Sequence, residues 1–432
     1  MLGYTGLIPG TNVCRRASTP VEGTERGVVI EATAVDRSLH GNRNFLLLWA
    51  GQFVSQLGDK LALVAFPWLV YQSTHSALNT GVVLAIYTLP YVLFGVVAGV
   101  LIDRFNKRLI MIFSDLLRAA LVLCVPLAAN WSIAAVFVLG FLVSSIGVFF
   151  DPCRLAIVPE LVSPPQLVRA NSLLATADSL TEVIGLAAAG FIVYGVGTRI
   201  AFSVDSITFV VSAVALSFMV YEGRPKPETR LDGGAVRREA GEGVSFIVHN
   251  RGMLMNTIMV AAATVGLGAI YPLTFLYAVQ VVGGGARTFG VLEATLAAGF
   301  LVGALALTAV ADRVRKGVLM IVGMTALGAC LIVIGTIDKM PLALVPFFLG
   351  GLANAVFLIA IDTYLQETVP EELRGRVSGV RFTLIQGLYA ASVLIGGALA
   401  ASYSVQGLFM VFGLIAVIPA LAGAFVPEIR RS

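Results

Sequence analysis

Long apolar segments, separated by short polar ones, follow one another along this chain of 432 residues. A helix that spans a bilayer needs roughly 20 consecutive apolar residues. By that criterion the sequence predicts twelve spanning helices, over residues 45–71, 77–101, 109–129, 132–152, 171–196, 200–221, 252–281, 288–310, 317–337, 341–365, 380–402 and 405–427. A β-barrel would show alternating segments of about 10 residues, not continuous runs such as 84–102. The pattern predicts an all-α polytopic membrane protein.

Composition and charge placement agree with this prediction. Charged residues make up 12% of the chain and hydrophobic residues 58%, whereas about 25% charged is usual in soluble domains. These values exclude a soluble globular enzyme, a disordered chain and a disulfide scaffold. If the N-terminus is inside, 24 of the 29 basic residues lie in or at the edge of cytoplasmic segments. The positive-inside rule therefore predicts that both termini are cytoplasmic.

The polar segments divide the chain into parts. We expect a cytoplasmic tail over 1–41, a six-helix bundle over 42–221, a cytoplasmic linker over 222–250, a second bundle over 251–427 and a short tail over 428–432. Proline and glycine oppose regular structure early in the linker. Its last part, from Glu239 to Arg251, is expected to form a helix on the membrane surface. The alternative is a solvated tether with no further role.

An internal repeat relates the two bundles. The dipeptide Asp-Arg at 103–104, after the second span, recurs at 312–313, after the eighth. Asp151 lies 48 residues beyond the first copy and Asp362 lies 50 residues beyond the second, and each precedes a Pro-Glu pair by eight residues. This matching predicts two duplicated, pseudo-symmetric halves. Such halves place a binding site at their interface and expose it alternately by rocking.

The segment Gly-Val-Leu-Ile-Asp-Arg-Phe-Asn-Lys-Arg at 99–108 resembles the signature of the major facilitator superfamily. That resemblance implies two six-helix bundles around a central cavity. It departs from the signature at Asn106, where Gly is usual, but Asn tolerates positive φ and the turn is expected to survive. A carboxylate at this helix end can form a latch that holds in one conformation only. The predicted cytoplasmic gating residues are Gly99, Asp103, Arg104, Lys107, Arg108, Asp115, Arg118, Asp312 and Arg313.

Two alternatives qualify this latch. Simple positive-inside anchoring explains Lys107 and Arg108 equally well. Asp115 and Arg118 stand at i and i+3 of one helix, where they can pair, and charges within lipid are usually matched in this way. We expect this pair to belong to the cytoplasmic latch, with substrate binding as the alternative.

Ionisable residues within spans are candidates for function. In the first span, Gln52, Gln56 and Asp59 fall on one helical face, which we expect to line a cavity. Lys60 points elsewhere, because residues i and i+1 do not share a face. The predicted cavity-lining residues are Gln52, Gln56, Asn256 and Asn354.

In the fifth span, Asp178 and Glu182 stand at i and i+4. Two like charges in a low dielectric resist ionising together, so one is expected to hold a proton. Asp59, Asp178 and Glu182 are therefore the predicted proton-coupling or substrate-cation residues, with structural hydrogen bonding as the alternative for each. Asp205 and Glu293 lie near the outer ends of their spans and are expected to be structural.

The chain also resembles a narrower group. Segments 42–59, 64–78, 151–162, 169–173 and 366–377 are similar to the macrolide efflux and enterobactin exporter group. The resemblance implies proton-coupled export of amphipathic compounds such as antibiotics, or of a siderophore.

This chain departs from drug–proton antiporters at two positions. Leu186 replaces the Pro of their Gly-Pro pair in the fifth span, so this helix is expected to be less kinked. Many antiporters also carry a membrane-embedded Arg in the fourth span. Arg154 is expected at the cytoplasmic end of that span instead.

The sequence thus predicts a secondary active transporter of the bacterial plasma membrane. We expect it to export small amphipathic drugs or antibiotics by alternating access with proton antiport, as a monomer among membrane lipids. The alternatives are a dedicated exporter or flippase of one endogenous product, such as a siderophore, secondary metabolite or lysolipid, and a non-transporting receptor or scaffold. Catalytic residues, cofactors, metal sites and nucleic-acid binding are not expected, because no motif for them occurs.

Overall fold

The computed structural model describes residues 39–102, 105–163, 166–221, 233–310 and 314–431. Within these ranges every regular element is a helix. In chain order they are η1 (Leu39–Gly41), α1 (Arg43–Thr74), α2 (Ala77–Ile102), α3 (Lys107–Ala128), α4 (Ile133–Leu161), α5 (Leu167–Leu180), η3 (Thr181–Gly185), α6 (Leu186–Ser217), α7 (Gly233–His249), α8 (Arg251–Leu276), η4 (Tyr277–Val281), α9 (Gly285–Val310), α10 (Lys316–Ile334), α11 (Met340–Thr368), α12 (Glu371–Leu399), α13 (Val405–Gly423) and α14 (Pro427–Arg431).

Ten of the described helices are long and apolar enough to cross a membrane. One of these is the continuous run Leu167–Ser217, whose 51 residues extend about 77 Å at 1.5 Å per residue, against a bilayer core of about 30 Å. Gly197 breaks this run with a φ of 83°, so the run holds the two predicted spans 171–196 and 200–221. The predicted span 77–101 lies on α2. Each predicted span therefore lies largely on a helix.

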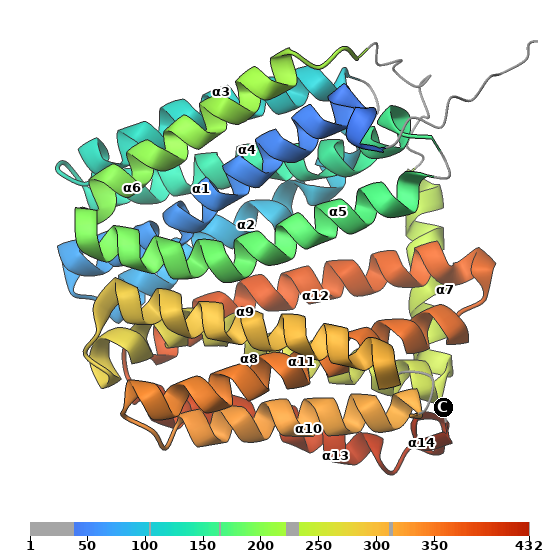
Figure 1. Cartoon of the computed structure of the whole chain (residues 1–432). Coiled ribbons are helices and arrows are strands. Elements are labelled where there is room, and N and C mark those ends of the chain that lie inside the picture. The colour runs from blue at the N-terminus through green and yellow to red at the C-terminus, as the bar shows by residue number, and fades with distance from the viewer. Residues whose placement is uncertain (1–38, 103–104, 164–165, 222–232, 311–313, 432) are drawn as a thin grey trace, which may run out of the picture. The chain divides into compact units, whose positions relative to one another are not determined.

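The helices form two groups that follow the chain (Figure 1). Helices α1 to α6 pack on one another, and α8 to α13 do the same. The groups meet along two seams. In one, α2 packs against α12, and in the other, η3 and the start of α6 pack against α9. Two groups of helices that follow the chain agree with the two halves that the repeat predicts.

Matching ion pairs mark the duplication. Lys107 at the start of α3 binds Glu160 near the end of α4, with Nζ and Oε1 2.8 Å apart. Lys316 at the start of α10 binds Glu367 near the end of α11 at 2.5 Å. Each pair joins the same two helices of its half. Both lie near the end at which α7 is found, which we call the linker end.

Helix α7 begins six residues earlier than the predicted surface helix. It packs against α12 and α8. Glu242 accepts a hydrogen bond from Arg376 on α12, and Gly243 lies so close that an added Cβ would stand 2.8 Å from the Arg376 carbonyl oxygen. The last part of the linker is therefore a helix fixed to the second half.

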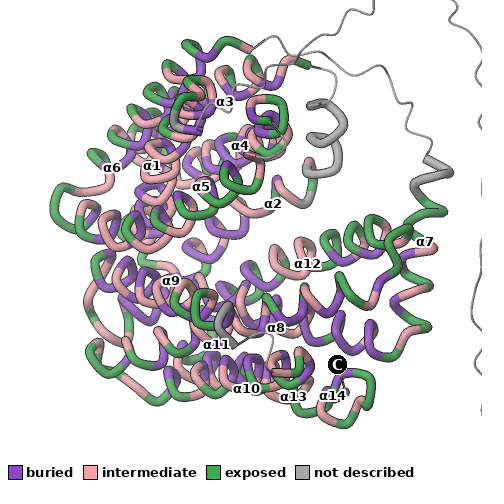
Figure 2. The backbone as a smooth tube through the Cα atoms, turned by 45° about the vertical axis from the view of Figure 1, so that its right-hand side comes forward, coloured by how far each residue is buried: buried purple, intermediate pink, exposed green. Residues whose placement is uncertain are grey.

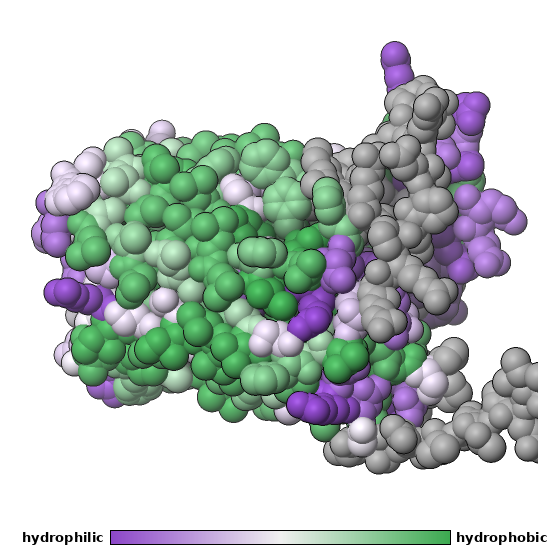
Figure 3. All heavy atoms as spheres, turned by 90° about the horizontal axis from the view of Figure 1, so that it is seen from above, coloured by the Kyte–Doolittle hydropathy of each residue, from purple (hydrophilic) through white to green (hydrophobic). Residues whose placement is uncertain are grey.

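Large apolar side chains cover the outside of the helices. Figure 3 shows a broad hydrophobic band on the visible face, with hydrophilic residues gathered towards its two ends. On α3, for example, Phe113, Leu117 and Leu127 are exposed, while Figure 2 shows buried residues on the inward sides of the helices. Such a surface is unfavourable in water and is explained by contact with lipid.

Candidate functional site

The two halves touch closely at the end opposite the linker end. An added Cβ on Gly81 of α2 would stand 2.4 Å from the Cα of Gly397 on α12. In the second seam, a Cβ on Gly190 of α6 would stand 2.9 Å from the Cα of Gly290 on α9. Only glycine permits backbones to approach this closely. These contacts hold the halves together at that end.

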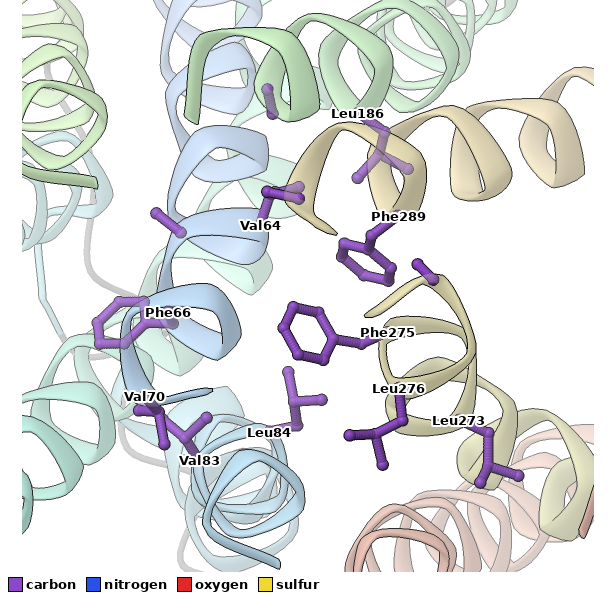
Figure 4. Packing of buried hydrophobic residues seen from close by; sticks show 14 of the residues in the cluster. Val64, Phe66, Val70, Val83, Leu84, Leu186, Leu273, Phe275, Leu276 and Phe289 are labelled. Atoms are coloured by element: carbon purple, nitrogen blue, oxygen red, sulfur yellow. The ribbon is translucent and has the colours of Figure 1, made fainter. Parts of the chain in front are cut away.

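Aromatic side chains fill the space beside these glycines. Phe275 on α8 packs against Phe289 on α9 and Trp68 on α1, with ring centroids 5.4 Å and 6.3 Å apart. Figure 4 shows the rings of Phe275 and Phe289 in the space between α1, which carries Val64, and the helices α8 and α9. Tyr271 on α8 also donates a hydrogen bond of 3.4 Å to a backbone carbonyl of α1. The seam is therefore closed by apolar packing from both halves.

A cavity of about 200 Å³ lies inside the first half. Its lining residues come from α1, α2, α3 and α4. They are Asp59, Lys60, Leu63, Tyr87, Tyr91, Arg118, Val143, Ser144, Gly147 and Asp151. Asp59 is the seventeenth of the 32 residues of α1, so the cavity lies at the middle of the spanning helices. Polar groups at this depth are those that handle ions or substrates in membrane carriers.

Arg118 is the central cation of this cavity. Its guanidinium binds Asp115 at 2.6 Å and lies 3.8 Å from Asp59. It also lies over the ring of Phe209, 4.2 Å from the centroid. The predicted Asp115–Arg118 pair is therefore present. However, Arg118 is the twelfth of the 22 residues of α3 and faces Asp59, so the pair lies at mid-membrane and not at a cytoplasmic latch.

A buried carboxyl adjoins this group. Asp205 on α6 is fully buried, and neither carboxyl oxygen has a hydrogen-bond partner. An added Cβ on Gly58 of α1 would stand 2.5 Å from Asp205 Oδ1. Asp205 and Glu293 are thus both buried in the packed interior.

Lys60 and Glu182 form an ion pair between α1 and η3. Glu182 lies in a π-helical turn, where the backbone widens by one residue. Gly185 in the same turn leaves room for the Lys60 stem, because an added Cβ would stand 3.0 Å from Lys60 Cγ. The irregularity expected from a Gly-Pro pair is thus supplied here by a π-turn just before Leu186.

Asp178 has its own cation. Arg154 on α4 donates to Asp178 at 3.1 Å, and Gln56 on α1 donates to the same carboxylate at 2.7 Å. Each of the two predicted carboxylates, Asp178 and Glu182, therefore has a cation partner on a neighbouring helix. Helix α4 continues to Leu161, so Arg154 lies within the helix and not at its end as expected.

Of the predicted cavity-lining residues, two are corrected. Gln52 is buried and donates to Ser212 on α6 at 3.4 Å. Asn256 is buried and donates to a backbone carbonyl of α11 at 3.0 Å. Both join helices within one half, because a buried amide is most stable when hydrogen-bonded. Gln56 is half-buried beside Asp178, and Asn354 is half-buried with Oδ1 lacking a partner.

The predicted gating residues at the linker end are only partly described. Asp103, Arg104, Asp312 and Arg313 lie outside the described residues, and Gly99 lies within α2. Lys107 pairs with Glu160, and Arg108 donates to the Leu216 carbonyl at 2.8 Å. These two residues therefore fasten α3 to α4 and α6 of the same half.

Asn106 stands in the turn before α3, where the sequence led us to expect a positive φ. Its φ is −67°, and its side chain caps α3 by accepting from Leu109 N at 3.3 Å. Asn is a favoured N-cap residue. Beyond the end of α6, Tyr221 donates to Glu160. Burial and this hydrogen bond raise the pKa of Tyr221, so the phenol keeps its proton.

Two partners of the candidate carboxylates were not predicted as site residues, namely Lys60 and Arg154. The signal available in the sequence was their rarity as charges within or beside apolar segments. Asp151, whose carboxylate accepts from Tyr91 at 3.3 Å, was noted only for the repeat. The charged residues that line the cavity are thus of both signs, an arrangement at mid-membrane that can exchange a proton or a cation between partners.

Two duplicated helical halves with charged pairs at mid-membrane define the class of multi-pass membrane carriers. The chain belongs to the Major Facilitator Superfamily, whose family model matches residues 48–392 and 288–431. It is a transporter of this family and not an enzyme, in a bacterial cell membrane.

Relatives in sequence and solved structures of similar fold are also transporters. The chain is 27% identical to the multidrug efflux pump Tap of Mycolicibacterium fortuitum, over 89% of this chain and 96% of that one. It is 22% identical to macrolide efflux protein A of Streptococcus pyogenes, over 90% and 96%. The nucleoside transporter NupG has a similar fold, with a TM-score of 0.72 at 12% identity over 88% and 98%. A bacterial homologue of the iron transporter ferroportin, in an inward-facing state, has a TM-score of 0.71 at 14% identity over 91% and 100%.

Proposed function

We propose that this protein exports small amphipathic drugs or antibiotics across the plasma membrane by alternating access, driven by proton antiport. The observation that carries the proposal is the position of Asp59. Its side chain is 38% exposed, lines the cavity of the first half, and lies 3.8 Å from Arg118. A carboxylate at mid-membrane that adjoins both a cavity and a cation can alternate between a proton and that cation.

In the proposed orientation both termini and the linker end face the cytoplasm. The described conformation then has its outer end closed by the glycine and aromatic contacts of the seams. A closed outer end is what an inward-facing state requires. Rocking of the halves about the seams would open the outer end.

Asp59, Asp178 and Glu182 have distinct parts in this proposal. Asp178 and Glu182 are each paired with a cation, Arg154 and Lys60. A substrate cation would compete with that resident cation for the carboxylate. Asp59 is held only by a longer contact, so it is the carboxylate that exchanges a proton most readily.

The substrate class rests on the relatives and on the surface of the seam. Tap is described as a multidrug efflux pump and its streptococcal counterpart as a macrolide efflux protein. Phe275 and Phe289 of the seam are buried here, and the aromatic side chains of the seam would present flat apolar surfaces when the outer end opens. Such surfaces suit amphipathic compounds and demand little shape specificity. We propose a monomer that works within membrane lipids, with protons and small molecules as its partners.

The test is accumulation of dyes and drugs in energised cells that express wild type, Asp59→Asn or Glu182→Gln, with and without a protonophore. Wild type is expected to lower accumulation, and the protonophore to abolish this effect. Asp59→Asn is expected to raise accumulation to the level of cells without the transporter, because an amide cannot carry the proton. Asp338→Asn, at an exposed loop position between α10 and α11, is the control and should match wild type.

Two outcomes would count against the proposal. If Asp59→Asn and Glu182→Gln both export fully and still respond to the protonophore, these carboxylates do not couple the proton. If wild type reaches the membrane but changes no compound in a broad panel, drug export is wrong, and a dedicated exporter of one endogenous product becomes the leading explanation.

A further inference from the structure

Glu293 on α9 is a buried carboxyl that the proposed cycle does not use. Its side chain is 7% exposed, and Oε1 has no hydrogen-bond partner. The hydroxyl of Thr274 on α8 is fully buried and is the neutral side chain that approaches this carboxyl. A buried acceptor left without a partner costs free energy. A site that retains such a group within a membrane calls for a functional explanation.

The charged groups that face Glu293 come from both halves of the molecule. Glu182 on η3 repels its carboxylate, and Lys60 on α1 attracts it. From the second half, the phenols of Tyr271 on α8 and Tyr389 on α12 interact with the same carboxylate. Helix α11, which also packs on α9, carries its acidic residues 362 and 367 towards the linker end.

Glu293 lies in the seam that closes the outer end in the proposed orientation. It is three residues beyond Gly290, whose backbone touches Gly190 of α6. It is four residues beyond Phe289, which packs on Tyr271 with centroids 5.4 Å apart. Burial of Glu293 therefore depends on contact between the halves, and separation of α9 from η3 and α6 would bring it to water.

We propose that Glu293 is a proton-binding site of the seam, and that it forms with Glu182 a carboxyl pair divided between the two halves. The seam closes around the protonated acid, because closing it around two carboxylates with one lysine leaves an uncompensated buried charge. When the outer end opens, Glu293 exchanges its proton with outside water.

The proton balance of the step is simple. A carboxylate oxygen of Glu293 takes one proton from outside water when the seam is open. After closure the proton passes to Glu182, whose side chain is 46% exposed, and from there to water on the cytoplasmic side. Lys60 leaves Glu182 while that carboxylate is protonated and returns afterwards. One proton enters by this route in each cycle. This inference rests on the proposed function, in which the proton is the coupling ion.

The test measures closure of the outer end against pH. Nitroxide labels are placed at Leu78→Cys and Ala401→Cys, exposed positions about one turn beyond the Gly81–Gly397 contact, with the four native cysteines replaced. Pulsed distance measurements on the full chain in lipid nanodiscs then follow the short-distance population from pH 5 to 9. Wild type is expected to lose this population as pH rises. Glu293→Gln should keep it at every pH, because the amide cannot ionise.

Further variants distinguish a proton site from a packing role. Glu293→Asp should retain a pH response, and Glu371→Gln, an exposed carboxyl at the start of α12, should match wild type. Glu182→Gln should move the midpoint about one pH unit lower, because removal of a neighbouring negative charge makes Glu293 easier to ionise. If Glu293→Gln does not fold, the shift of the midpoint in Glu182→Gln still tests whether Glu293 binds a proton.

The inference is overturned if Glu293→Gln follows pH as wild type does, or if Glu182→Gln leaves the midpoint in place. Proton and dye flux in liposomes made from the same wild-type preparation test the proposed function separately. Absence of both fluxes overturns proton-coupled export and with it the carrier role of Glu293. A pH response of the seam that vanishes in Glu293→Gln still supports proton binding there.

Discussion

Charges within the described helices are mostly neutralised by residues on neighbouring helices. Lys60 pairs with Glu182, Arg154 with Asp178, and Arg118 with Asp115. An ion pair in a membrane avoids the cost of an isolated charge, and rearranging it costs little when one cation has several carboxylates within reach. The carboxyls that lack such a partner are therefore those from which we expect proton exchange.

The close approach of α1 to α6 leads to a prediction at the residue scale. Gly58→Ala would place a Cβ 1.9 Å from Thr208 Oγ1 and 2.5 Å from Asp205 Oδ1. We expect a loss of about 1–3 kcal/mol in the free energy of unfolding, because the helices must separate. The measurement is the midpoint of thermal unfolding in detergent. Gly375→Ala is the control, since nothing lies within 4 Å of its added Cβ. Equal midpoints for the two variants would contradict the packing argument.

Among the elements, α7 differs most from its expectation. The sequence predicts a surface helix from Glu239 to Arg251 or a solvated tether. The described helix starts at Gly233 and is bound to α12 through Glu242 and Arg376. Gly243 explains the close contact, because only a residue without Cβ fits against the α12 backbone there. The helix thus belongs to the second half, and it will move with that half when the halves rock.

The packing of α7 on α12 gives a prediction at the element scale, for which Gly241, two residues before Gly243, is the control. Gly243→Leu would push α7 off α12, because its Cβ would stand 2.8 Å from the Arg376 carbonyl oxygen. Gly241→Leu has nothing within 4 Å. Hydrogen exchange of residues 237–249 should become about ten-fold faster or more in the first variant and stay unchanged in the second. Equal exchange in both would show that α7 is not fixed by this contact.

At the scale of the whole molecule, the two seams decide which end is closed. Each places a glycine of one half against a glycine of the other, Gly81 with Gly397 and Gly190 with Gly290. Backbone contact without side chains lets two helices pivot on each other at little steric cost. Alternating access needs such pivots, since the halves must stay together while their ends open in turn.

Gly190→Leu tests the second seam. Its Cβ would stand 2.9 Å from both Gly290 Cα and the Ala286 carbonyl oxygen, whereas Gly195 on the same helix has nothing within 4 Å. We expect Gly190→Leu to abolish export and to lower the short-distance population of the nitroxide pair, because the outer end cannot close. Gly195→Leu, expressed at the same level, should behave as wild type. Full export by Gly190→Leu would rule out a tight contact at this seam during transport.

The sequence by itself determined the fold class, the approximate spans and the duplication. These follow from local properties, since twenty apolar residues in a row specify a spanning helix wherever they stand. The family also followed from short motifs. Single residues were predicted best where helical spacing settles the contact, as with Asp115 and Arg118 at i and i+3.

Only the tertiary structure decided how the polar residues combine. Lys60 and Glu182 are 122 positions apart, as are Gln56 and Asp178, and no local spacing connects them. The length of α4 placed Arg154 inside the helix, and helix packing turned Gln52 and Asn256 towards buried partners. The seam then enclosed Glu293, which the sequence presented as a structural residue. Burial and pairing depend on which helices meet, and that is settled by packing across the whole chain rather than by any one segment.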